Sequence, residues 1–298
     1  MFSFTSASIE PQWVKGKLAM EKDIEGSAGN SIVLIDPKTN KEEIVLTAEQ
    51  MKDWAMQDWQ FSPDGNKLLF VTQKNQIYRH SFLANYAVYD ITKKEWFQPW
   101  GNETIEECSW SPNGDFVWVK DGNLFYSCWE WDNISSGRKD ENLNVEDDQT
   151  FDQRFTKTIQ ITHDGDYIKN GVADWIYEEE ILQSSRAYYW SKNGSILAYL
   201  KFNDEKVTKF PLTVENVDRI FTSGSDMINY INYPRPGEEN PKVSLHYVKI
   251  SDLNSQYERM NKKFENKIDF SKQITSLHKP YGELDYLIQK IEWNQGKT

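Results

Sequence analysis

The phrase Trp110-Ser111-Pro112-Asn113-Gly114 recurs along the chain and decides the fold that we predict. Related copies lie at residues 59–65 and 190–194, and a degenerate copy begins at Trp293. Proline at the second turn position and glycine at the fourth are typical of a type I turn, and apolar residues follow the first three copies. Each of these copies therefore predicts a strand, a tight turn and a second strand.

Recurrence of one short-strand unit is typical of a repeat architecture, here the blades of a β-propeller. The first two copies are roughly 50 residues apart, which suits one blade, and the longer later intervals indicate insertions or a drifted turn phrase. A β-sandwich is the alternative, because it also has many short strands with regular turns. The recurring phrase favours the propeller. We predict an all-β chain that forms an incomplete β-propeller of about four blades, each an antiparallel four-stranded sheet.

Composition agrees with a β fold and excludes one class of partner. Phe, Trp and Tyr make up 14% of the 298 residues, and aromatic side chains are enriched in strands. The alternating residues 31–47 predict a hairpin. The net charge of −12 argues against binding of nucleic acid, because its phosphates attract surfaces rich in Lys and Arg.

The two cysteines, Cys108 and Cys128, fall on the first and third of three predicted strands. Neighbouring strands are about 4.8 Å apart, so these cysteines would lie roughly 10 Å apart, which is too far for a disulfide. We expect that they do not pair with each other. No cluster of cysteine and histidine has the spacing of a metal site, so neither a metal nor a cofactor is expected.

An acidic run, Glu178-Glu179-Glu180, follows two large aromatic residues, Trp175 and Tyr177. Like charges repel and a desolvated carboxylate is unfavourable, so one interpretation is a solvated helix face. In the other, the aromatic residues hold the carboxylates at the wall of a cavity, where they attract a cation such as a peptide's amino terminus. A Ca²⁺ site is disfavoured, because Ca²⁺ takes six to eight oxygen ligands and three adjacent glutamates cannot all converge on one ion.

Residues 174–181, Asp-Trp-Ile-Tyr-Glu-Glu-Glu-Ile, resemble the signature of the dipeptidyl peptidase IV family. In that family the second and third glutamates bind the free α-amino group of the peptide substrate. By position, the resemblance gives this role to Glu179 and Glu180, while Glu178 is a neighbour of unclear role. Asp174, Trp175 and Tyr177 would support the pair.

A second segment, Arg79-His80-Ser81, resembles the same family. Taken alone, Arg79 is a surface arginine and His80 a turn histidine. The family has an arginine followed by His-Ser here, and that arginine contacts a substrate carbonyl near the glutamate pair. The resemblance therefore makes Arg79 the third substrate-binding residue. Gln183 departs from the serine that is frequent in the family, which affects the shape of the subsite and not its charge.

The peptidases of this family cut with a serine in a Gly-x-Ser-x-Gly elbow of an α/β-hydrolase domain, and the chain has no such spacing. We therefore expect residues 1–298 to be a partial N-terminal propeller domain whose catalytic α/β-hydrolase domain is absent, and a fragment of a longer protein. Residues 130–156 are expected to be an inserted acidic loop, and residues 251–285 are a divergent segment.

The resemblance implies that the chain is the specificity propeller of a serine-type dipeptidyl aminopeptidase. Its partners would be peptide N-termini, an α/β-hydrolase domain and a second copy in a homodimer. The alternative is a non-catalytic propeller that serves as a protein-binding scaffold. The chain has neither a signal peptide nor an apolar span, but the family implies an extracellular or cell-surface parent. Sequons predict N-glycosylation at Asn102, Asn133 and Asn193.

Overall fold

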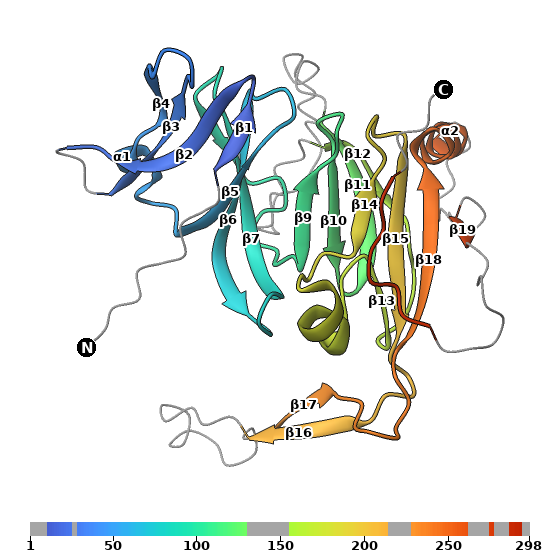
Figure 1. Cartoon of the computed structure of the whole chain (residues 1–298). Helices are drawn as coiled ribbons and strands as arrows, with labels where there is room; N and C mark the ends of the chain where they lie inside the picture. The colour runs from blue at the N-terminus through green and yellow to red at the C-terminus, as the bar shows by residue number, and fades with distance from the viewer. Residues whose placement is uncertain are drawn as a thin grey trace, which may run out of the picture. The chain divides into compact units, whose positions relative to one another are not determined.

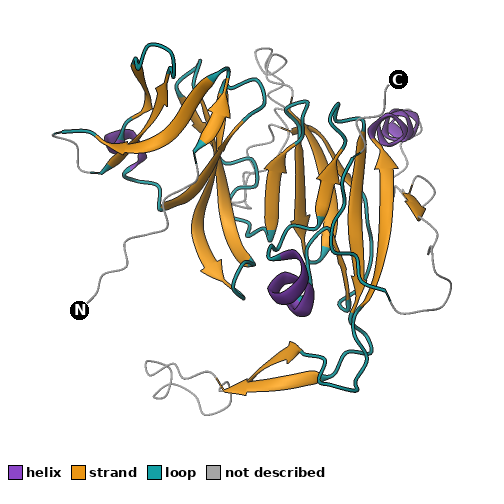
Figure 2. Ribbon diagram, in the orientation of Figure 1, coloured by secondary structure: helices purple, strands orange, loops and turns teal. Residues whose placement is uncertain are grey.

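The computed structural model describes residues 11–25, 29–129, 155–213, 228–261, 274–276 and 286–293 (Figure 1). The chain divides into two compact units, and each is described by itself. The first unit comprises Met1–Asn75, Leu83–Val117 and Ser127–Thr158, and the second comprises Gln76–Phe82, Trp118–Tyr126 and Ile159–Thr298. Strands dominate the described residues (Figure 2), and helix is confined there to α1 (Ala48–Met51), a π-helix (Tyr177–Leu182) and α2 (Ile250–Asn261).

The first three sheets are antiparallel and four-stranded, and in each the strands pair in chain order. The first contains β1 (Gln12–Val14), β2 (Lys17–Asp23), β3 (Asn30–Ile35) and β4 (Glu42–Leu46). The second contains β5 (Met56–Phe61), β6 (Lys67–Gln76), β7 (Phe82–Asp90) and β8 (Glu95–Phe97). The third contains β9 (Glu107–Trp110), β10 (Phe116–Lys120), β11 (Asn123–Trp129) and β12 (Phe155–Gln160). Such up-and-down sheets are the blades of a propeller, whereas a sandwich has Greek-key connections.

The recurring phrase forms the same turn in all three described copies. Its serine carbonyl accepts a hydrogen bond from the glycine N–H three residues later, at 2.8 Å for Ser62, 3.0 Å for Ser111 and 2.8 Å for Ser191. The three glycines have φ between +63° and +86°, a conformation that costs glycine little. Each serine hydroxyl also accepts the N–H of a residue near the start of the next strand. The predicted strand-turn-strand units are therefore confirmed, as is the hairpin at 31–47, which is β3 and β4.

The cysteines lie where strand spacing places them. Cys108 is on β9 and Cys128 is on β11, with β10 between these strands in the sheet. Neither cysteine forms a disulfide, which confirms the prediction that they do not pair with each other.

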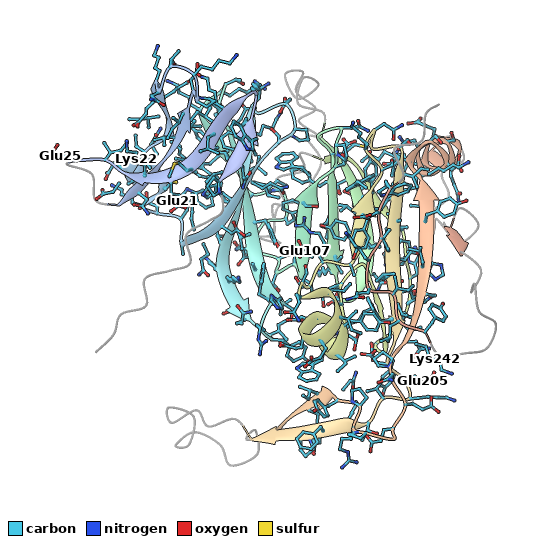
Figure 3. All side chains as sticks on the ribbon, viewed as in Figure 1. Glu21, Lys22, Glu25, Glu107, Glu205 and Lys242 are labelled. Atoms are coloured by element: carbon cyan, nitrogen blue, oxygen red, sulfur yellow. The ribbon has the colours of Figure 1, made fainter. Side chains whose placement is uncertain are left out.

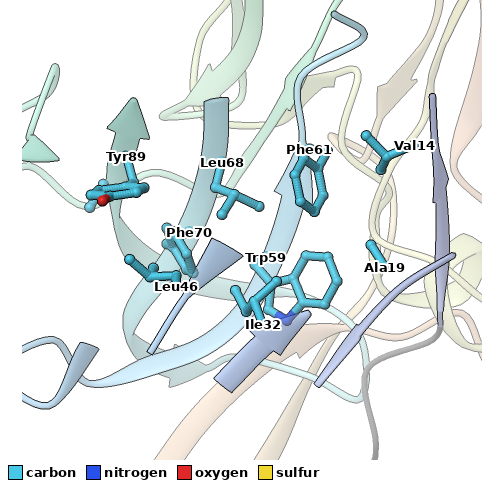
Figure 4. Close-up of a cluster of buried hydrophobic side chains, with 10 residues drawn as sticks. Val14, Ala19, Ile32, Leu46, Trp59, Phe61, Leu68, Phe70 and Tyr89 are labelled. Atoms are coloured by element: carbon cyan, nitrogen blue, oxygen red, sulfur yellow. The ribbon is translucent and has the colours of Figure 1, made fainter. Parts of the chain in front are cut away.

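The core of the first unit lies between the apolar faces of its first two sheets (Figure 4). Trp59 is only 3% exposed, and its indole N–H donates to Glu21 Oε1 at 3.0 Å. Burial of each large apolar side chain contributes about 1.5–3 kcal/mol relative to exposure. Glu21 lies on β2 beside Lys22 (Figure 3), whose ammonium pairs with Glu42 at 2.6 Å.

The fourth sheet differs from a four-stranded blade because one of its edge positions is divided between two short strands. β15 (Ile196–Asn203) pairs on one side with both β13 (Ile168–Asn170) and β14 (Tyr188–Trp190), and on the other with β18 (Lys242–Lys249), which pairs with β19 (Ile274–Ser276). Asn170 lies opposite Lys201 and Tyr188 lies opposite Tyr199. The strand at this edge is therefore interrupted by the excursion 171–187, which carries the acidic run.

A hairpin interrupts the chain between two strands of this sheet. β16 (Lys209–Thr213) and β17 (Ile228–Asn232) form a separate antiparallel hairpin, which is placed between β15 and β18 in the chain. Glu205 follows the end of β15 at Asn203, and Lys242 is the first residue of β18 (Figure 3). The predicted insert 130–156 lies outside the described residues except for the start of β12, and the divergent segment 251–285 is described only in α2 and β19.

Gly171 closes the excursion and has no room for a side chain. Its N–H donates to Leu200 O, and its carbonyl accepts the N–H of Ala187, both at 2.9 Å. Its φ is +73°, and an added Cβ would lie 2.9 Å from two carbon atoms of Leu124. We expect Gly171→Ala to lower the free energy of unfolding by about 2 kcal/mol more than Gly237→Ala does. Both substitutions place a Cβ on a residue with a left-handed φ, but only the Cβ at position 171 would overpack the core.

Gly237 is the matched control, since its φ is +87° and an added Cβ meets no atom within 4 Å. Urea unfolding of both variants measures the difference. Equal losses would show that Leu124 moves aside without cost.

Candidate functional site

The excursion 171–187 is a closed projection with a short helix at its tip. Val172 and Arg186 form an antiparallel bridge, and the N–H of Ala173 donates to Ser185 O at 2.8 Å. Between these residues the chain forms the π-helix, an uncommon helix that is found frequently at functional sites. The helix ends at Leu182. The next residue, Gln183, has a left-handed φ of +54°, and its side-chain amide donates to Glu179 O.

The three glutamates of the run have different surroundings. Glu178 is 0% exposed, Glu179 has a side chain that is 10% exposed, and Glu180 is exposed. The interpretation as a solvated helix face is therefore wrong for Glu178 and Glu179 and fits only Glu180. Among the described residues Glu180 has no ion-pair or hydrogen-bond partner, so its carboxylate is accessible to a ligand.

Arg79 lies against the second glutamate. Its Nε is 3.1 Å from Glu179 Oε2, and its backbone N–H donates to Glu179 Oε1 at 3.1 Å. The arginine side chain is 69% exposed, so most of its guanidinium faces solvent. The structure therefore brings together two of the predicted residues, with Glu180 next to Glu179 in the same helix.

Glu178 accepts two backbone hydrogen bonds from the same loop. Its Oε1 lies 2.6 Å from His80 N and 2.7 Å from Ser81 N. Its Oε2 is buried and has no partner within the described part of the chain. Sequence reasoning left the role of Glu178 open. The resemblance placed Arg79 near the glutamate pair, but nothing in the sequence indicated that Glu178 accepts the N–H groups of His80 and Ser81.

The predicted supporting residues fix the base of the helix. Tyr177 is 0% exposed, and its ring centroid lies 4.8 Å from that of Phe202 on β15. Trp175 is half-buried and lies 4.7 Å from the ring of Tyr233. Asp174 precedes the helix, and its Oδ2 accepts the N–H of Ile176 at 3.2 Å.

Asp174 also interacts electrostatically with Asp204, which follows β15. The sequence did not predict this pair. The two side chains are 0% and 2% exposed. Burial raises the pKa of Asp174 to about 7, and the charge of Asp204 adds to this rise, while Lys169 opposes it. Burial likewise raises the pKa of Asp204, against a hydrogen bond from Asn232 that lowers it. At neutral pH the carboxyl of Asp174 is therefore partly protonated.

Tyr78, which precedes Arg79, completes this acidic region. Its pKa is raised by burial and then by the charges of Glu178, Asp204 and Asp174. The phenol therefore stays neutral at physiological pH, and the region keeps a hydroxyl group beside its carboxylates.

Two of the predicted glycosylation sites are described. Asn102 and Asn193 are both exposed, and Asn193 Oδ1 accepts hydrogen bonds from Ser191 and Ser195 within the turn. Asn133 lies outside the described residues. In the part of the chain that the structure describes, no three acidic, cysteine or histidine side chains form a metal-binding group, and no helix there could cross a membrane.

Comparison with known families shows which family the chain belongs to. The family model described as "Dipeptidyl peptidase IV (DPP IV) N-terminal region" matches residues 62–298. The chain belongs to this family. The matched range includes both the Arg79 loop and the acidic run, so the resemblance on which the site residues were predicted is confirmed at the level of the family.

The chain is also similar in sequence to individual peptidases of this family. The chain is 33% identical over 222 residues to Dipeptidyl aminopeptidase B of Saccharomyces cerevisiae, a match that covers 72% of this chain and 23% of the relative. It is 30% identical over 232 residues to Dipeptidyl peptidase 4 of Felis catus, which covers 76% of this chain and 27% of the relative. It therefore spans only about a quarter of the length of these peptidases.

A solved structure shows the fold. The crystal structure of Porphyromonas gingivalis dipeptidyl peptidase 4 aligns with a TM-score of 0.66 and 20% identity, over 93% of this chain and 34% of that protein. This likeness, together with the meandering four-stranded sheets, confirms the predicted incomplete propeller. Residues 62–298, which match the N-terminal region of the family, therefore belong to a chain with a propeller-type fold.

Proposed function

We propose that this chain anchors the free amino terminus of a peptide for a serine-type dipeptidyl aminopeptidase. The observation that supports the proposal is the meeting of the Arg79 loop with Glu179, beside an accessible Glu180. An ammonium group has several N–H donors and no acceptor. Two adjacent carboxylates can accept these donors in charge-assisted hydrogen bonds, which are roughly twice as strong as neutral ones.

Arg79 has two roles in this proposal. Its positive charge beside Glu179 offsets part of the repulsion between the two adjacent carboxylates. Its terminal nitrogens, which lie on a largely exposed side chain, would donate to the first carbonyl of the peptide. A substrate held at its amino terminus and first carbonyl has a fixed length before any cleavage point, so the site selects a dipeptide by position.

The remaining catalytic parts belong to the full-length protein in this proposal. An α/β-hydrolase domain of the parent would supply the serine nucleophile and its histidine and aspartate. The propeller would then contribute specificity and orientation, and the reaction would be peptide hydrolysis. The family membership and the names of the two peptidases above support this assignment.

A comparison of two peptides tests the proposal directly. The tripeptide Ala-Pro-Ala and its N-acetylated form differ only in the charge and donors of the first nitrogen. We expect the 298-residue chain to bind the free peptide at least about tenfold more tightly, because acetylation removes the ammonium charge and its hydrogen bonds to carboxylates. Calorimetric titration of both peptides measures this ratio.

The pH provides an internal control. The α-amino group of a peptide has a pKa of about 7.7–8.0, so binding of the free peptide should weaken as the pH rises above about 8. Binding of the acetylated peptide should not follow this change. Equal affinity for the two peptides would contradict the proposal and favour the scaffold interpretation.

A further inference from the structure

Glu178 stands apart from its neighbours because it is entirely buried and yet faces a loop far away in sequence. Its Oε1 accepts hydrogen bonds from two successive backbone N–H groups, those of His80 and Ser81, at 2.6 and 2.7 Å. The preceding N–H, that of Arg79, donates to Glu179 Oε1 at 3.1 Å. Three consecutive backbone donors of one loop therefore converge on two adjacent carboxylates.

The loop cannot satisfy these three donors by itself. Its internal hydrogen bonds run to the carbonyl of Ser81 from the N–H groups of Ile77 and Tyr78, and Gln76 Nε2 donates to carbonyls within the loop. The carbonyls thus have partners inside the loop, whereas the N–H groups of residues 79–81 are directed at the glutamates. A buried N–H left without an acceptor costs about 1–3 kcal/mol.

The side chain of Arg79 depends on this backbone anchorage for its position. Because that side chain is 69% exposed and its Nε meets only Glu179, packing contributes little to its placement. Ser81, by contrast, is 6% exposed and is fixed through Glu178. The backbone of the loop therefore determines where the guanidinium lies, and Glu178 holds that backbone.

We propose that Glu178 is a positioning residue, whose carboxylate holds the Arg79 loop against the glutamate helix so that the guanidinium meets Glu179 and a bound peptide. This inference rests on the proposed function, because it assigns Glu178 to the peptide site without contact to the peptide. It also explains why one member of the acidic run is buried. A carboxylate with two backbone donors makes stronger, charge-assisted bonds than a neutral acceptor would.

The test is a double-mutant cycle in the 298-residue chain, with the affinity for Ala-Pro-Ala as the readout. We expect Glu178→Ala to weaken binding by about tenfold, and Glu178→Gln to restore it to within about threefold of wild type, since the amide oxygen can still accept both N–H groups. In an Arg79→Ala background, Glu178→Ala should have no further effect, because it acts through that arginine. A full tenfold effect in both backgrounds would overturn the proposal.

The control for general destabilisation is Asp90→Ala in the first unit. Asp90 is 2% exposed, and its Oδ1 accepts hydrogen bonds from the N–H groups of Thr92 and Lys93 at 2.8 and 2.9 Å. It is thus also a buried carboxylate that holds a loop backbone. Asp90→Ala should leave the affinity for the peptide unchanged, and an equal loss in this variant would overturn the specific role of Glu178.

Hydrogen exchange of the His80 and Ser81 amides separates this inference from the proposed function. Glu178→Ala should remove the protection of both amides whether or not a peptide is bound, and unchanged protection would refute the anchoring. If the wild-type chain does not distinguish the free peptide from its acetylated form, the proposed function fails and the role of Glu178 in peptide binding fails with it. If the wild type distinguishes them but Glu178→Ala binds normally, only the inference about Glu178 fails.

Discussion

Replacement of both Glu179 and Glu180 by glutamine is expected to lower the affinity for Ala-Pro-Ala by at least about 100-fold. A hydrogen bond to a charged group contributes about 1.5–3 kcal/mol, and two such bonds to an ammonium would be weakened together. Glutamine keeps the size of each side chain, so the helix and its contact with the Arg79 loop remain possible. Calorimetric titration of the double variant against wild type measures the loss.

The matched control removes two other adjacent glutamates. Glu42 and Glu43 lie on β4 in the first unit and pair with Lys22 and Lys17. Glu42→Gln combined with Glu43→Gln changes the net charge by the same amount, and we expect no change in affinity. A similar loss in both double variants would mean that only the overall negative charge of the chain attracts the peptide.

The single variants should differ from each other. Glu180 has an exposed side chain, so Glu180→Gln should act only on the ligand. Glu179 also holds Arg79, so Glu179→Gln should act on the ligand and on the guanidinium, and its effect should be the larger. In a full-length parent, either change should reduce dipeptide release while the fold persists.

Much of the fold could be predicted from the sequence because its signals are local. Serine and glycine at fixed positions are enough to specify a turn, and the same hydrogen bonds recur at Ser62, Ser111 and Ser191. The strand order followed from these turns, since consecutive strands joined by tight turns must pair as neighbours. The cysteine prediction followed from the strand order.

The interior of the site could not be predicted in the same way because its determinants are distant in sequence. Three identical glutamates have the same local chemistry, and only their contacts decide that Glu178 is buried and Glu180 exposed. Glu178 meets Ser81, 97 residues away, and Asp174 lies near Asp204, which follows β15. The sequence also did not predict that β13 and β14 share one edge of a sheet, because neither short strand has a pattern that assigns it to an edge.

The free energy of unfolding is expected to fall by about 3 kcal/mol between about pH 5 and pH 8 because of Asp174. Burial raises the pKa of this carboxyl from 3.8 to about 7, with Asp204 adding to the rise and Lys169 opposing it. In the unfolded chain the carboxyl of Asp174 ionises near its ordinary pKa of 3.8. Between pH 3.8 and about pH 7 the folded chain therefore binds one more proton than the unfolded chain. The resulting stabilisation is complete at low pH and is lost as the pH rises through about 7.

Asp174→Asn should remove this dependence, since an amide cannot ionise but keeps an oxygen that can accept the N–H of Ile176. Urea unfolding from about pH 5 to pH 8 should show the variant gaining on wild type with rising pH. The pKa of His246 is lowered by burial, so this residue makes the free energy of unfolding rise with pH in both proteins, and its effect cancels in the difference.

Asp36→Asn is the control. Hydrogen bonds lower the pKa of this exposed carboxyl, so its effect on the free energy of unfolding changes only below about pH 5. If the curves of Asp174→Asn and wild type ran parallel, Asp174 would be ionised in the folded chain throughout, and the acidic region would hold a fixed charge instead of a proton.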